Sequence, residues 1–62
     1  MTREDRERMQ THSTMVYHID IGSSIQLVLI DIKDGLYYFK GLEDYGGLTA
    51  KEVEECFVIM QL

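Results

Sequence analysis

The chain has 62 residues, a formal net charge of −5 and a single cysteine. A chain of this length forms one domain at most and buries only about 60% of the surface that its unfolded form exposes, so its core is thin. Cys56 alone excludes an intramolecular disulfide, and one cysteine with two separated histidines is a poor ligand set for structural zinc. We therefore expect self-association to add stability, with a homodimer as its simplest form.

The negative charge is unevenly distributed along the chain. Residues 1–12 are neutral overall, whereas residues 13–62 carry three lysines against eight acids. Direct nucleic-acid binding needs lysine and arginine at the phosphates, so we expect none here. The acidity either attracts a basic partner or only aids solubility. The sequence has no 18-residue apolar run and no secretory-signal pattern, which predicts a cytoplasmic protein without a membrane span.

The N-terminal quarter differs in character from the rest. Residues 1–14 are polar with mixed charge and no apolar period, which predicts a disordered tail followed by a single small domain over residues 15–62. From Met15 onward, apolar residues alternate with polar ones through Ile21. This period of two is typical of a strand and places His18 on the solvent side.

A β-hairpin is the clearest local prediction. Residues 25–33 are apolar on both faces, which indicates a central strand or one whose second face meets another subunit. Asp34-Gly35 then separates this run from a second strand-like run over residues 36–40. Asp-Gly between two such runs predicts a type I′ turn, because both central residues need positive φ.

The remainder predicts one short helix and a last strand. Glycines at both ends limit residues 41–48 to a single turn through Leu42–Tyr45. Thr49 and Glu52 match a capping box that favours a helix from Ala50, while the run "CFVIM" favours a strand. We expect a strand over about 53–61, preceded by at most one capped turn. The predicted fold class is α+β: a small three-stranded antiparallel sheet with one short helix between the hairpin and the C-terminal strand.

The residue patterns that carry catalysis do not occur. The sequence contains no Ser-His-acid arrangement, no glycine-rich phosphate loop and no calcium loop. Glu43 and Asp44 are adjacent carboxylates on a short loop, without a cleft to shift their pKa values. We therefore predict a binding protein and not an enzyme, with no cofactor and no metal.

Residues 25–62 carry a series of short motifs in a characteristic order. An apolar strand ends at an acidic turn, and tyrosines, a Lys-Gly-Leu run, an acid before Tyr-Gly and an apolar C-terminal strand follow. The motifs are Asp34-Gly35, Tyr37-Tyr38, Lys40-Gly41-Leu42, Tyr45-Gly46, and Thr49-Ala50 with Glu52-Val53. In this order the region resembles the small dimeric uracil-DNA glycosylase inhibitors of Bacillus podophages. Two segments are shorter than in that family, one of them where the family carries its helix, and residues 1–24 have no clear counterpart.

The resemblance implies a homodimer in the host bacterial cytoplasm that blocks the DNA-binding cleft of the host uracil-DNA glycosylase by mimicking DNA. It assigns two groups of residues. Partner binding would involve Glu43, Asp44, Tyr45 and, farther away, Asp34; the apolar pocket or dimer core would involve Tyr37, Phe39 and Leu42. From the residues alone, the rings of Tyr37 and Phe39 are equally typical of an ordinary core.

Two other functions fit the same sequence. One alternative is a small regulatory module that binds an unrelated host or phage protein through its sheet edge. It is also compatible with a DNA mimic directed against another DNA-binding enzyme.

Overall fold

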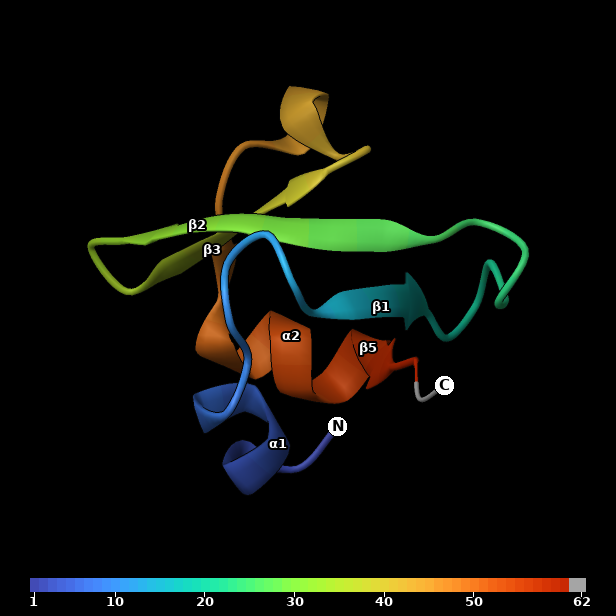
Figure 1. Cartoon of the computed structure of the whole chain (residues 1–62), viewed down its shortest axis with the longest axis horizontal. Coiled ribbons are helices and arrows are strands. Elements are labelled where there is room, and N and C mark those ends of the chain that lie inside the picture. The colour runs from blue at the N-terminus through green and yellow to red at the C-terminus, as the bar shows by residue number, and fades with distance from the viewer. Residues whose placement is uncertain (61–62) are drawn as a thin grey trace.

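The computed structural model describes residues 1–60 and has an α+β fold (Figure 1). Five strands form one antiparallel sheet, which is accompanied by two short helices and one 3₁₀ turn. In chain order the elements are α1 (Arg3–Glu7), β1 (Met15–His18), β2 (Leu27–Lys33), β3 (Leu36–Lys40), η1 (Glu43–Tyr45), β4 (Leu48–Thr49), α2 (Ala50–Cys56) and β5 (Phe57–Ile59). Neither helix within residues 1–60 is long and apolar enough to cross a membrane.

The sheet has five strands in the order β4-β3-β2-β1-β5, so the predicted three-stranded sheet is wrong. The central hairpin is confirmed, with β2 and β3 close to the predicted ranges. Strand β1 inserts between β2 and β5 and pairs with both, Tyr17 lying opposite Val58. Strand β4 adds a short edge beside β3. The pairing of β1 with β5 joins segments about 40 residues apart, which local patterns do not reveal.

The hairpin turn has the backbone that its sequence predicts. Asp34 and Gly35 both have positive φ, 54° and 76°, as a type I′ turn requires. Lys33 and Leu36 face each other across the turn. An irregularity in the pairing between Leu29 and Asp31 interrupts the regular register of β2 against β3.

Helix α2 is longer than predicted. Its capping box is present: the Thr49 hydroxyl accepts a hydrogen bond from the Glu52 N–H, and the Glu52 carboxylate accepts one from the Thr49 N–H at 3.1 Å. The helix continues to Cys56, so the predicted strand over 53–61 is wrong up to that residue, and β5 begins only at Phe57. Val53 is fully buried in the core. This packing stabilises the helix more than the strand-like composition of the segment disfavours it. Residue 61 lies outside the described residues.

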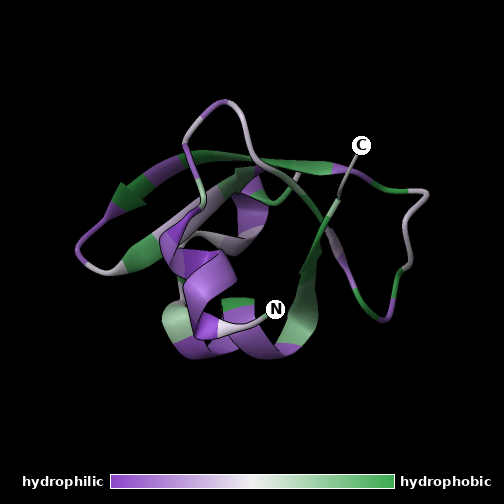
Figure 2. Ribbon diagram, turned by 60° about the horizontal axis from the view of Figure 1, so that its bottom comes forward, coloured by the Kyte–Doolittle hydropathy of each residue, from purple (hydrophilic) through white to green (hydrophobic). Residues whose placement is uncertain are grey.

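The core lies between the inner face of the sheet and α2. Its buried side chains come from every strand, from α2 and from the segment between α1 and β1: Met9, Val16, Leu27, Leu29, Tyr37, Phe39, Leu48, Val53 and Phe57. The rings of Phe39 and Phe57 are stacked, with centroids 5.2 Å apart. Figure 2 shows hydrophilic residues along α1 and hydrophobic ones concentrated on the strands. The core therefore joins the two ends of the chain to the central hairpin.

Residues 1–14, for which the sequence predicts a disordered tail, contain helix α1. The Thr2 hydroxyl accepts from the Asp5 N–H and caps the helix. The Arg6 guanidinium lies 2.6 Å from the Glu54 carboxylate on α2 and donates to the Tyr37 hydroxyl, and Met9 is buried. The partners of Arg6 are more than 30 residues away along the chain, so the local sequence pattern does not predict these contacts.

Candidate functional site

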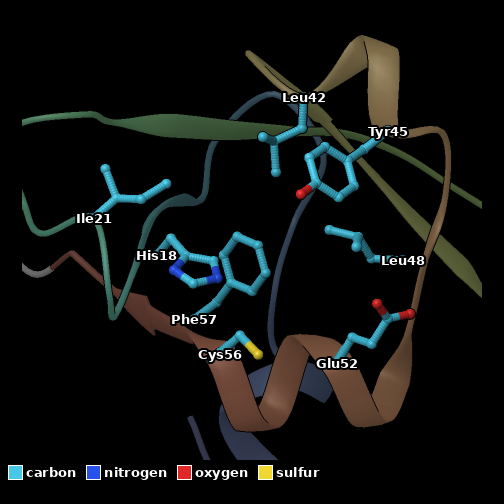
Figure 3. A pocket seen from close by; sticks show the side chains of 8 residues that line it. All are labelled: His18, Ile21, Leu42, Tyr45, Leu48, Glu52, Cys56 and Phe57. Carbon is cyan, nitrogen blue, oxygen red and sulfur yellow. The ribbon is translucent and has the colours of Figure 1, made fainter.

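An apolar pocket of about 310 Å³ opens between η1 and α2 (Figure 3). Eight side chains line it: His18, Ile21, Leu42, Tyr45, Leu48, Glu52, Cys56 and Phe57. The volume is at the lower end of the about 300–1,000 Å³ of pockets that hold small ligands. The pocket suits one bulky apolar group, because most of its lining is carbon.

The 3₁₀ turn η1 forms the upper wall. The Leu42 N–H donates to the Phe39 carbonyl at 3.1 Å, and the Tyr45 N–H donates to the Leu42 carbonyl at 3.0 Å. Gly46 ends the turn with φ at 74°, a value that a side chain disfavours. The predicted single turn is thus confirmed. Figure 3 shows Leu42 and Tyr45 directed from the turn toward the pocket, and Tyr45 is 76% exposed.

Helix α2 and the ends of β1 and β5 form the lower wall. The imidazole of His18 meets the Phe57 ring edge to face, with centroids 5.3 Å apart. Its Nδ1 accepts from the Asp20 N–H at 3.1 Å, which assigns the proton of the neutral ring to Nε2. His18 is half-buried against Phe57 and lines the pocket, in contrast to the predicted solvent side.

The acidic residues predicted to contact a partner lie in two separate parts of the structure. Glu43 and Asp44 are exposed on η1, next to Tyr45. The Glu43 carboxylate accepts from the Gly41 N–H, whereas the Asp44 carboxylate has no hydrogen-bond or ion-pair partner within residues 1–60. Asp34 lies in the hairpin before β3, and η1 follows β3, so the length of that strand separates them by about 17 Å. The structure therefore unites three of the four predicted contact residues.

The predicted pocket residues also divide. Leu42 lines the pocket, but Tyr37 and Phe39 are buried core residues, 6% and 1% exposed, and are absent from its lining. The Tyr37 hydroxyl accepts a hydrogen bond from Arg6. The pKa of Arg6 is raised, first by its hydrogen bond to Glu54 and then by that to Tyr37. The hydrogen bonds of Arg6 to Glu54 and Tyr37 hold α1 against α2 and the sheet, and none of these three residues lines the pocket.

Sequence reasoning missed most of the pocket wall. Glu52 and Cys56 are four residues apart on α2, a spacing that places them on one face of a helix. That signal exists only once residues 50–56 are known to be helical. His18 and Ile21 precede this wall by more than 30 residues, and nothing in their sequence context indicates a shared cavity.

The described residues contain no cluster of three or more His, Cys, Asp or Glu side chains that would hold a metal ion. No protein-family model matches the chain, and no curated protein and no solved structure is significantly similar to it.

Proposed function

We propose that this chain is a non-enzymatic inhibitor of a uracil-DNA glycosylase and occupies the enzyme's DNA-binding cleft as a DNA mimic. One observation carries the proposal: an exposed acidic turn, Glu43–Tyr45, borders an open apolar pocket. The eight residues that line the pocket include no lysine or arginine. The resemblance over residues 25–62 makes a bacteriophage the expected source and the host's glycosylase the expected target.

The chemistry of the target matches this combination. A glycosylase flips its base out of the duplex and pays the cost of unstacking, and its cleft must be basic to hold the phosphates. Apolar side chains that wedge between base steps are a common device for opening a duplex. In our proposal such a side chain enters the pocket between Leu42 and Phe57. Full burial of one large apolar side chain contributes about 1.5–3 kcal/mol.

The acidic turn supplies the complementary charge. Asp44 is exposed and free of intramolecular partners within residues 1–60, so its carboxylate is available to a cation of the enzyme. Glu43 is exposed as well, although it already accepts from the Gly41 N–H. Such rim charges mainly raise the association rate and make it depend on salt.

The proposal includes a homodimer through the outer face of the sheet. The register places half-buried apolar side chains on that face, opposite the core: Met15, Tyr17, Val28, Tyr38 and Val58. No helix of residues 1–60 has its main contacts there, since α1 packs on α2. A second copy covering this face would compensate for the small core of a single chain.

We prefer this function to binding through a sheet edge. The two edge strands, β4 and β5, have only two and three residues, which leaves little backbone for an added strand. A DNA mimic directed at a different enzyme would use the same acids, and only the choice of partner separates that alternative from our proposal.

The direct experiment measures uracil excision by a purified bacterial uracil-DNA glycosylase with increasing amounts of this protein. We expect excision to stop near stoichiometric amounts and a complex to elute on sizing, with the free protein at the size of a dimer. Undiminished excision at molar excess together with separate elution would refute the proposal. Inhibition of a nuclease but not of the glycosylase would instead favour the alternative target.

A further inference from the structure

The loop between β1 and β2 exposes three isoleucines. Ile19, Ile21 and Ile25 retain 58%, 53% and 52% of their surface exposed, and they occur within residues 19–26, which we name the isoleucine loop. Single exposed apolar residues are common on protein surfaces, but three within eight consecutive residues concentrate apolar surface on one loop. Figure 1 shows this loop extending beyond the ends of the two strands.

The exposure follows from where β1 ends. The strand ends at His18, and the chain turns there because the N–H groups of Ile21 and Gly22 both donate to the His18 carbonyl, at 3.2 and 2.9 Å. Gly22 has φ at 92°, which allows the chain to leave the strand direction. The alternation seen in the sequence therefore does not bury Ile19 and Ile21 against the core.

The isoleucine loop is continuous with the pocket. Ile21 belongs both to the loop and to the pocket lining, and Figure 3 shows it next to His18 on the pocket wall. A partner whose side chain fills the pocket would thus also lie over the loop. The loop is on the side of the pocket away from Glu52, so it extends the apolar surface in a new direction.

Charge indicates what covers this surface. The only charged side chain in the loop is Asp20, and the only acid in the pocket lining is Glu52, with no lysine or arginine in either. An anionic membrane would repel a chain of net charge −5. In the proposed function a second copy covers the outer face of the sheet, and the loop stays free for another partner. A basic protein surface with an apolar patch fits both features.

We infer that the isoleucine loop is a second contact surface for the basic enzyme whose side chain fills the pocket, an inference that rests on the proposed function. The loop packs against an apolar patch of that enzyme next to its DNA-binding cleft. Since about half of each isoleucine remains to be buried, Ile19→Ser and Ile25→Ser should each weaken binding roughly fivefold, and the double variant roughly 25-fold.

The experiment compares these variants with Ile32→Ser in binding to a bacterial uracil-DNA glycosylase, measured by calorimetry and by inhibition of excision. Ile32 is 43% exposed on β2 near the hairpin, far along the strand from the loop, so its substitution should change affinity less than twofold. Neither Ile19 nor Ile25 lines the pocket, and the thermal midpoint of each variant should match that of the wild type.

The outcomes separate this inference from the proposed function. If the wild type and the loop variants bind the glycosylase equally tightly, the inference about the loop is wrong and the proposed function stands. If the wild type does not bind at all, both the inference and the proposed function are wrong. Sedimentation with vesicles of phosphatidylcholine, alone or with phosphatidylglycerol, should carry down none of the protein. Vesicle binding that the double variant loses, or a loss of dimer in that variant on sizing, would also overturn it, because the loop would then serve a membrane or a second copy.

Discussion

Replacing Tyr45 by alanine should separate partner binding from folding. The side chain points from η1 toward the pocket, yet 76% of its surface is exposed. It therefore contributes little to the core, and Tyr45→Ala should change the free energy of unfolding by less than about 0.5 kcal/mol. Its contribution is expected in the complex instead.

The magnitude follows from the exposed area. A tyrosine buries about 150–250 Å², so about 150 Å² of Tyr45 is available to a partner. At about 25 cal/mol per Å² this area corresponds to an upper limit of about 3–4 kcal/mol. Ordering of side chains and imperfect desolvation reduce that limit, and we expect a loss of about 2 kcal/mol, or about 30-fold in Kd.

The assay is a titration of glycosylase inhibition, with thermal unfolding measured on the same samples. Tyr45→Phe is the matched control, because it keeps the ring and removes only the hydroxyl, and it should inhibit within threefold of the wild type. An alanine variant that inhibits as well as the wild type, at an unchanged thermal midpoint, would show that the upper wall of the pocket has no part in binding.

Three further outcomes are expected. Glu43→Gln with Asp44→Asn should slow association with the glycosylase and flatten its dependence on salt, as measured by stopped flow, and an unchanged salt slope would argue against DNA mimicry. Thr49→Ala should lower stability by about 1 kcal/mol through loss of the cap of α2, or about 4–8 °C in Tm, while Thr49→Ser keeps the cap; equal midpoints in calorimetry would contradict this. The pKa of Glu7 is lowered because the Arg3 guanidinium donates to its carboxylate at 2.7 Å, so this pair stabilises α1 above the ordinary pKa of a glutamate and ceases to do so as the pH falls through the lowered value. NMR titration should find the Glu7 pKa closer to its ordinary value in Arg3→Gln, and the same pKa in both proteins would refute the pairing.

Parts of the site could be predicted because their signals are local. The glycines at 41 and 46 limit the chain between them to one turn, so Glu43, Asp44 and Tyr45 appear together on the surface as expected. Tyr37 and Phe39 show the limit of this reasoning. Alternation along β3 indicates that they share a face, but only the position of α2 makes that face the core.

The sequence by itself determined the α+β class, the β2–β3 hairpin and the capped start of α2. Each of these depends on residues within a few positions of one another: the positive φ values of Asp34 and Gly35, and the reciprocal hydrogen bonds of Thr49 and Glu52. Such local interactions do not depend on how the rest of the chain folds, so residue types and spacing are enough to predict them.

The tertiary structure alone decided the strand order, the docking of α1 and the pocket. Strand β1 pairs with β5 across about 40 residues, and Arg6 meets Glu54 across 48. The pocket has walls from both halves of the chain, among them His18 and Cys56. Closing the long loops between these residues costs conformational entropy, and the contacts form only because burial of a shared core offsets that cost. This balance depends on the whole chain and not on any local pattern.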